Sequence, residues 1–207
     1  MDLQFFGANC IVLTYKGSRI VIDDNLADLG AKSVTKPEDV SLFTGVHGTP
    51  APARLTFDAP GEYEVSDISI IGIPAQAHID ERGSHNATMF KLVAGDQSAL
   101  ITGHIYPDLT DDQLEQIGIV DLLIVPVGGS GYTVDPVGAL KLIKAIEPKL
   151  VIPVHYSDSA LKFSVPQQDL AHALVELGME AKETVTKLRL KPGELTDVTQ
   201  LVILEKA

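Results

Sequence analysis

Two uninterrupted apolar runs in the second half of the chain place the strongest constraint on the fold. Residues 122–127 and 150–154 contain no polar side chain, so each is expected to form a strand that is buried on both faces. A helix is expected between them, with Asp135 as its N-cap, Pro136 at its first position and its end at Ile146. A sheet built from such strands must be covered on both sides.

The first half of the chain is dominated by short β-rich runs separated by turn signals. Expected strands cover residues 3–6, 11–15, 19–22, 40–43, 55–57, 63–65, 68–73, 88–93 and 99–102. Strands followed by βα units predict two sheets packed together with helices on the outer faces. The predicted fold is therefore α/β, a four-layer αββα sandwich formed by one domain over residues 1–207.

Three further segments carry expectations about local structure. Residues 75–87 lack apolar periodicity and are expected to form an exposed loop of the kind found around active sites. Pro166 is expected to open a helix that Gly178 ends, because residues 170, 173, 174 and 177 form one apolar stripe. Residues 185–190 and 198–204 are expected to be the last two strands.

The composition narrows the class of protein. The net charge is −12, which disfavours binding to the phosphate backbone of nucleic acids. No stretch approaches the ~20 apolar residues of a membrane span, and the first residues lack the basic charge of a signal peptide. The single cysteine, Cys10, excludes an internal disulfide and fits a reducing compartment. These features predict a cytoplasmic protein that binds neither nucleic acid nor membrane.

Four histidines lie at or just beyond the ends of expected strands: His47, His78, His104 and His155. Loops at strand ends commonly carry binding and catalytic groups. Imidazole nitrogen is a good ligand for zinc, and also for iron, copper or nickel. The pattern therefore indicates a candidate metal site, whereas His85 and His172 are expected to be ordinary surface residues.

Several motifs spread over most of the chain resemble the metallo-β-lactamase superfamily, the zinc-dependent hydrolases of the β-lactamase fold. The opening strands are similar to those of the family, and Asp23 corresponds to its structural acid. The most specific matches are residues 125–129 and 152–156, and the second of these contains His155. The matching segments are residues 6–10, 20–23, 60–65, 100–103, 125–129 and 152–156. The resemblance implies an αββα sandwich with its site along one edge, and it assigns the last histidine ligand of the family to His155.

The metal motif of that family is altered in this chain. A histidine-x-histidine-x-aspartate-histidine run is expected at residues 45–50, where Gly45, Thr49 and Pro50 replace three of the four ligands and only His47 remains. His78 matches the next family histidine, and His104 stands in place of the bridging aspartate. A neutral imidazole cannot bridge two metal ions as a carboxylate does, so the resemblance argues against a dinuclear centre.

A single divalent ion, zinc being the best match, remains compatible with His47, His78, His104 and His155; the other reading is that no metal is bound. Three nitrogen ligands and a water would make the ion catalytic, whereas four would make it structural. Tyr132 and Tyr156 lie near the expected site and are candidate substrate-binding residues. Asp80 follows His78 closely, but no residue can be assigned as the catalytic acid or base.

Three functions fit the sequence. One is a hydrolase with one reorganised metal site that acts on an ester, lactone or phosphoester. The second is a non-catalytic relative that keeps the fold and the pocket for binding or regulation. The third is a subunit of a homo-oligomer whose histidines only form hydrogen bonds. The expected partner in the first two cases is a small molecule.

Overall fold

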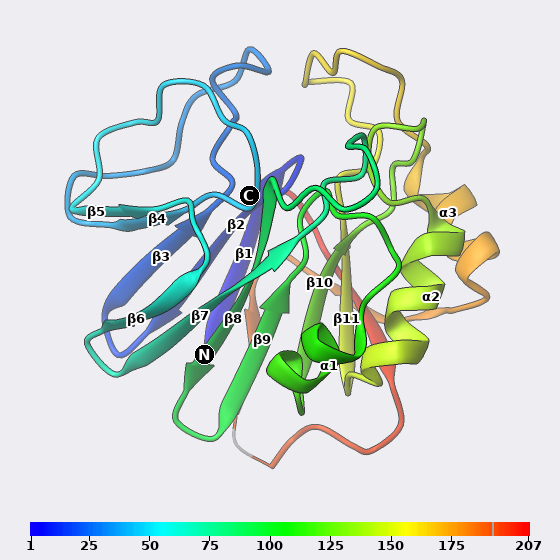
Figure 1. The fold of residues 1–207 in the computed structure, drawn as a ribbon. Coiled ribbons are helices and arrows are strands. Elements are labelled where there is room, and N and C mark those ends of the chain that lie inside the picture. The colour runs from blue at the N-terminus through cyan, green and yellow to red at the C-terminus, as the bar shows by residue number, and fades with distance from the viewer. Residues whose placement is uncertain (192) are drawn as a thin grey trace.

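The computed structural model describes residues 1–191 and 193–207 and contains two β-sheets that pack face to face (Figure 1). The six-stranded sheet has the order β13-β1-β2-β3-β4-β5. Its strands are β1 (Asp2–Gly7), β2 (Cys10–Tyr15), β3 (Ser18–Ile22), β4 (Val40–Leu42), β5 (Leu55–Phe57) and β13 (Leu188–Arg189). Strands β1, β2 and β3 form antiparallel hairpins, and β4 and β5 continue the sheet in parallel.

The eight-stranded sheet has the order β12-β14-β11-β10-β9-β8-β7-β6. Its strands are β6 (Gly61–Val65), β7 (Ile68–Ala75), β8 (Ala87–Ala94), β9 (Gln97–Ile101), β10 (Leu122–Pro126), β11 (Leu150–Val154), β12 (Ala181–Val185) and β14 (Gln200–Leu204). Strands β6 to β9 are antiparallel neighbours, whereas β9, β10, β11 and β14 run parallel. The carboxyl ends of β9, β10 and β11 therefore point to one edge.

The main hydrophobic core lies between the sheets. It combines side chains such as Ile11 and Ile20 from the six-stranded sheet with Ile70, Phe90 and Ile124 from the eight-stranded sheet. Every residue of β10 and β11 is buried, as their uninterrupted apolar sequences predict. Burial on both faces requires a second layer outside this sheet.

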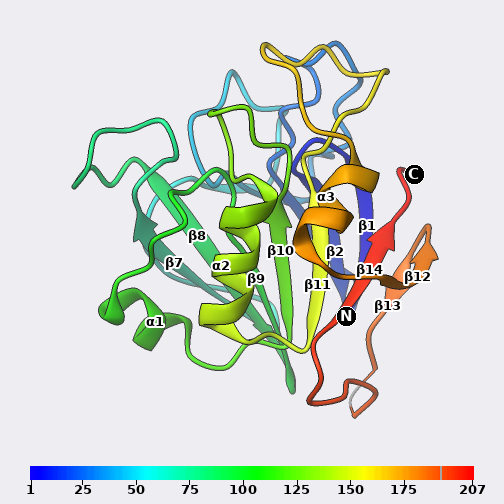
Figure 2. The same cartoon turned by 90° about the vertical axis from the view of Figure 1, so that its right-hand side faces the viewer.

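Three helices form that layer: α1 (Asp111–Ile117), α2 (Pro136–Ile146) and α3 (Leu170–Leu177) (Figure 2). Their buried residues pack with the outward side chains of the eight-stranded sheet, for example Leu142 and Ala173 with Val125 and Val151. Thr110 forms a capping box with Gln113, and Asp135, the predicted N-cap, accepts a hydrogen bond from the Gly138 N–H at 2.7 Å. No helix in the described part of the chain is long and apolar enough to cross a membrane.

The two-sheet α/β fold predicted from the sequence is confirmed, and its outermost layer on the six-stranded side is made of loops. Cys10, Val12 and Val21 point away from the central core and are buried beneath Leu26 and Leu161. Within residues 1–191 and 193–207, no helix covers this face. The segments that follow β3 and β11 therefore provide its apolar cover.

Two local predictions were wrong. The helix expected from Pro166 begins at Leu170, because the Asp169 carboxylate accepts from the His172 N–H at 2.9 Å, while Gln168 forms backbone hydrogen bonds to Gly128 and Ser157. The strand expected over residues 185–190 is not continuous: Val185 ends β12, which pairs with β14 in one sheet, and Leu188 and Arg189 form β13, which pairs with β1 in the other. The chain bends between them because one straight strand cannot pair with both sheets.

Candidate functional site

The four candidate metal-binding histidines lie on loops at the same edge of the sandwich. His47 lies in the loop after β4, His78 in the loop after β7, His104 in the loop after β9, and His155 directly after β11. In Figure 1 the cyan loop after β4 and the yellow loop after β11 project from the same end of the molecule. Parallel strands bring their carboxyl ends together, which explains how residues so far apart in sequence share one edge.

A buried carboxylate fixes the start of the loop that carries His47. Asp23, just after β3, accepts hydrogen bonds from the Thr44 backbone N–H at 2.7 Å and from its hydroxyl at 2.6 Å. Burial raises the pKa of Asp23 to about 6, although the bonds from Thr44 oppose this shift. Gly103 packs so closely that a Cβ there would lie 2.0 Å from Thr44 Oγ1. The loops after β3, β4 and β9 are therefore tied together at Thr44.

His104 and His155 form the most closely packed pair at the site. Their ring centroids are 4.4 Å apart and the rings are nearly perpendicular, at 86°. The Asn9 Nδ2 group lies 3.0 Å from His104 Nε2 and donates to it. His155 is only 4% exposed. Three ring nitrogens, Nδ1 of His104 and both nitrogens of His155, are buried and have no hydrogen-bond partner.

Both buried imidazoles are neutral at physiological pH. Burial, with a further contribution from His78, lowers the pKa of His104 to about 4. Burial and the neighbouring His104 hold the pKa of His155 well below its ordinary value of 6.5. The neutral ring is the form that binds metals, because it keeps one nitrogen lone pair. An unpartnered buried nitrogen otherwise costs about 1–3 kcal/mol, so these three atoms are unusual in a folded interior.

His47 and His78 already have partners. His47 Nδ1 donates to the Gly48 carbonyl at 2.8 Å, its Nε2 faces the Asp58 carboxylate at 3.5 Å, and its ring packs on Phe43 with centroids 4.1 Å apart. His78 Nδ1 donates to the Ile105 carbonyl at 3.3 Å, which leaves the lone pair on its other nitrogen. These two side chains are partly exposed, as is that of His104, whereas His155 is buried.

Two adjoining cavities connect the four histidines. The first, of about 520 Å³, is lined by His47, His78 and His104 together with Tyr132. The second, of about 400 Å³, shares His47, His104 and Tyr132 with the first and adds His155. The structure thus brings all four histidines predicted as metal ligands to one region, within the size range of small-molecule sites.

The candidate metal ligands at this edge of the sandwich are imidazole nitrogens. The resemblance to the family places the remaining ligands of a dinuclear centre at Gly45, Thr49 and Pro50, none of which has an imidazole or a carboxylate. Imidazole nitrogens suit one ion. A neutral His155 offers one unpartnered lone pair, whereas His104 Nδ1 carries the ring proton as long as Nε2 accepts from Asn9, so His104 would bind an ion only in its other tautomer. Among the described residues, however, no group of three or more histidine, cysteine or acidic side chains is arranged to hold a metal. A third ligand would require side-chain movement.

The two tyrosines proposed as substrate-binding residues lie in different surroundings. Tyr132 lines both cavities, with its ring centroid 5.1 Å from that of His104. Tyr156 packs against Phe5 at 5.7 Å, and burial raises its pKa to about 12. It is absent from the walls of the two cavities. The structure therefore brings Tyr132, and not Tyr156, to the histidines.

Three residues of the site were not identified from the sequence. Asn9 contacts His104 from the turn between β1 and β2; it lies within the matching segment 6–10, but nothing there marked it as a partner of a histidine. Asp58 faces His47 from the segment after β5, and Asp28 lines the second cavity. No local signal distinguishes these two acids among the 28 acidic residues of the chain.

Residues 2–155 match a family profile described as the Beta-lactamase superfamily domain. A UPF0173 metal-dependent hydrolase of Chloroflexus aurantiacus is 28% identical over 185 residues, which cover 83% of this chain and 73% of the relative. A second one, from Carboxydothermus hydrogenoformans, is 36% identical over 72 residues, which cover 35% of this chain and 31% of the relative. The matched segment therefore spans less than a third of that protein.

Solved structures share the fold over almost the whole chain. A Thermotoga maritima protein assigned to the Zn-dependent hydrolases of the metallo-β-lactamase superfamily aligns with a TM-score of 0.75 and 24% identity, covering 99% of this chain and 98% of the other. Igni18, a metallo hydrolase from Ignicoccus hospitalis, aligns with a TM-score of 0.60 and 17% identity, covering 86% and 90%. At these identities the likeness concerns the fold alone.

Proposed function

Because the chain belongs to the β-lactamase superfamily and has the metallo-β-lactamase fold of metal-dependent hydrolases, we propose that it hydrolyses a small ester, lactone or phosphoester with the help of one divalent metal ion. Zinc suits the imidazole ligands best. The observation that carries the proposal is the His104–His155 pair, which has three buried ring nitrogens without a hydrogen-bond partner; His104 lines both cavities and His155 lines the second.

Residues of the two cavities would bind the metal ion, orient its ligands and contact the substrate. His104 and His155 would hold the ion with a third imidazole from His78 or His47, and the ion would act as a Lewis acid and lower the pKa of its water to about 7. With its amide turned so that Oδ1 accepts from His104 Nε2–H, Asn9 would orient that ring and leave the Nδ1 lone pair for the ion. Tyr132, which lines both cavities, would pack against the substrate.

A binding or regulatory role without catalysis is the second candidate. The observation that favours it is the absence, in the described part of the chain, of three converging metal-binding side chains. Gly45, Thr49 and Pro50 also leave only His155 of the ligands that would hold a second ion. In this reading the two cavities still accept a small molecule, but the unpartnered imidazole nitrogens form hydrogen bonds to it.

Metal analysis of untagged protein separates the two candidates. The hydrolase proposal expects about one zinc per chain after incubation with zinc and desalting, and loss of that zinc in the His155→Ala variant. His172→Ala is the matched control, because His172 is exposed on α3 and bonded only to Asp169. Generic carboxylic esters, lactones and phosphoesters should be turned over by the zinc-loaded protein, and a chelator should stop the reaction.

The proposal fails if untagged protein retains no metal above background after exposure to zinc, iron and manganese. It also fails if metal binds equally well to the wild type and to His155→Ala. Metal retention without turnover of any substrate class would leave a structural ion, and it would favour the binding role.

A further inference from the structure

The two cavities beside the histidines carry negative charge and lack lysine and arginine. Four aspartates line them: Asp58 and Asp80 in the first cavity, and Asp23 and Asp28 in the second. Among the described residues that line either cavity, no basic side chain other than histidine is present. A cavity walled by one sign of charge concentrates ligands of the opposite sign.

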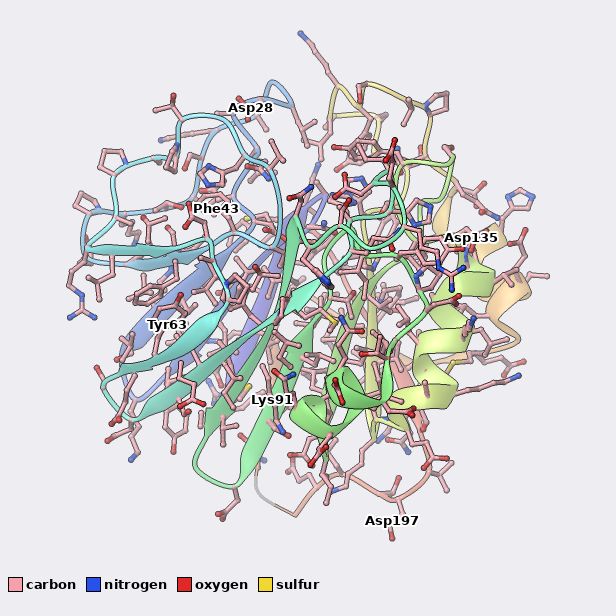
Figure 3. The ribbon with its side chains drawn as sticks, viewed as in Figure 1. Asp28, Phe43, Tyr63, Lys91, Asp135 and Asp197 are labelled. Atoms are coloured by element: carbon pink, nitrogen blue, oxygen red, sulfur yellow. The ribbon has the colours of Figure 1, made fainter. Side chains whose placement is uncertain are left out.

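These carboxylates are not neutralised elsewhere. Asp58 faces only His47, at 3.5 Å, and Asp80 accepts from the Asn86 amide at 2.9 Å. Asp28, labelled at the upper left of Figure 3, lies against Gly48, where an added Cβ would be 2.6 Å from its Oδ2. In the part of the chain that the structure describes, none of the three forms an ion pair with lysine or arginine.

Some acids outside the cavities do pair with lysine or arginine. Asp39 pairs with Arg19, and Asp121 accepts from Lys149 at 2.9 Å. Asp158 accepts from Lys206 at 2.5 Å. The basic partners of these three acids lie outside the two cavities, whose described walls contain four aspartates and no lysine or arginine.

The mouth of the cavities is apolar. Val46 and Ile79 line the first cavity from opposite loops and are 94% and 66% exposed. Tyr132 adds an aromatic ring that is 39% exposed and lines both cavities. Large apolar side chains so exposed at the rim of a polar pocket are typical of a binding surface. An aromatic face beside carboxylates also suits an organic cation.

A second observation places the ligand at this site. His155 is only 4% exposed and lines the second cavity. Both of its ring nitrogens lack a hydrogen-bond partner. The acids and apolar rim surround the approach to these nitrogens. The reacting end of a substrate would reach the histidines while its remaining part stays among the aspartates.

We propose that the site selects positively charged substrates, namely esters or lactones that carry a compact organic ammonium group, over anionic ones. The proposal rests on the proposed function, and it removes phosphoesters from the substrate classes considered above. Three solvent-facing carboxylates, Asp28, Asp58 and Asp80, outweigh the two positive charges of one divalent ion. The field at the mouth therefore stays negative when the metal is bound.

Three probes of equal shape test the proposal on metal-free, chelator-treated protein: choline, 3,3-dimethyl-1-butanol and 3,3-dimethylbutanoate. They present a cation, a neutral group and an anion, and ligand-observed NMR titration gives their dissociation constants. Choline should bind about 3- to 10-fold more tightly than the neutral alcohol, and the carboxylate more weakly than both. Raising the salt concentration from 0.05 to 0.5 M should remove most of the difference, because solvent-exposed charges are screened.

Variants locate the effect. Asp58→Asn and Asp80→Asn should each reduce the preference for choline by about 2- to 5-fold, whereas binding of the neutral alcohol should not change. Asp96→Asn is the matched control, because it removes one exposed acid from the turn between β8 and β9. Ala87, the first residue of β8, lines the first cavity, and Asp96 follows the opposite end of that strand. That variant should retain the wild-type preference.

Equal affinities for the three probes, tighter binding of the carboxylate, or no binding of any of them overturns the proposal. So does an equal effect of Asp58→Asn and Asp96→Asn, which would indicate only the overall charge of the protein. Because binding is measured without metal, these outcomes are distinct from failure of the hydrolase proposal. With zinc, acetylcholine should be hydrolysed faster than 3,3-dimethylbutyl acetate at low salt.

Discussion

At the scale of single residues, the four candidate histidines form two pairs that differ in the hydrogen bonding of their ring nitrogens. His104 and His155 are neutral and have buried, unpartnered nitrogens, whereas His47 and His78 donate to backbone carbonyls at the cavity wall. Side chains whose polar atoms are left unsatisfied lower the stability of the protein. A ligand that completes their bonding would account for their presence here, so the stability of the protein without ligand tests this explanation.

His155→Phe should therefore leave the metal-free protein as stable as the wild type or stabilise it by about 1 kcal/mol. The reason is that phenylalanine has similar shape but no buried nitrogens to desolvate. The backbone of His155 is left-handed, with φ of 53°, which disfavours either residue through its Cβ. Urea unfolding in the presence of a chelator measures the change, and His172→Phe on the exposed face of α3 is the control. A loss above 2 kcal/mol would contradict the interpretation.

The contact between Gly103 and Thr44 gives a second prediction. Gly103→Ala should destabilise the protein by roughly 2–4 kcal/mol, because the new methyl group meets the Thr44 hydroxyl that bonds to Asp23. Gly178→Ala is a closely matched control: both glycines have φ of 63°, but nothing lies within 4 Å of the Cβ position at Gly178. The difference between the two variants in urea unfolding isolates the steric contact. Equal losses would mean that only backbone strain matters at Gly103.

At the scale of secondary-structure elements, much of the architecture could be predicted from local pattern. The apolar runs that became β10 and β11 and the caps at Thr110 and Asp135 follow from propensity and short-range hydrogen bonds. The start of α3 and the split into β12 and β13 could not be predicted, because distant partners decide them. Gln168 bonds to Gly128, and the strand-like run at 181–189 pairs with two different sheets.

The candidate site shows the same division. Its histidines could be found from their positions at strand ends and from the altered family motif. Their partners could not, since the contacts of Asn9 with His104 and of Asp58 with His47 join segments 95 and 11 residues apart. Burial and side-chain direction also decide which of Tyr132 and Tyr156 reaches the cavities, and neither property follows from sequence spacing.

Asp121 links the starts of β9, β10 and β11, and its carboxylate should make the stability of the protein depend on pH. Burial alone would raise the pKa of Asp121, but hydrogen bonds from Lys149 and Ser98 outweigh it and lower the pKa below the ordinary 3.8. An acid with a lowered pKa stabilises the folded state above its unfolded pKa, and that stability is lost as the pH falls below 3.8.

Asp121→Asn should accordingly cost about 1 kcal/mol at pH 7, and the difference from the wild type should shrink toward zero near pH 3. Lys149 is partly exposed, which keeps the expected size small. Urea unfolding of both proteins at several pH values provides the measurement. Glu81→Gln, in the loop after β7, is the control for loss of an exposed acid. A difference that grows at low pH would have the wrong sign.

At the scale of the whole molecule, ligand binding and folding are linked, because the site draws on loops from both sheets. One zinc ion that binds only the folded protein should raise its free energy of unfolding by about 2.7 kcal/mol at 100 times the dissociation constant. His104→Ala should remove most of this gain and His172→Ala should keep it. Thermal unfolding of untagged protein at increasing zinc concentration tests this. An equal gain in His104→Ala would place the ion elsewhere.

The loops over the outer face of the six-stranded sheet have a consequence for motion. Leu29 and Phe163 help to cover the buried outward side chains of that sheet, and the same two residues line the second cavity. Any local opening that widened this cavity would therefore bring water to Cys10 and Val12. Amide hydrogen exchange in β2 should consequently slow when the cavity is filled, so a strand that makes no contact with the ligand would report its presence.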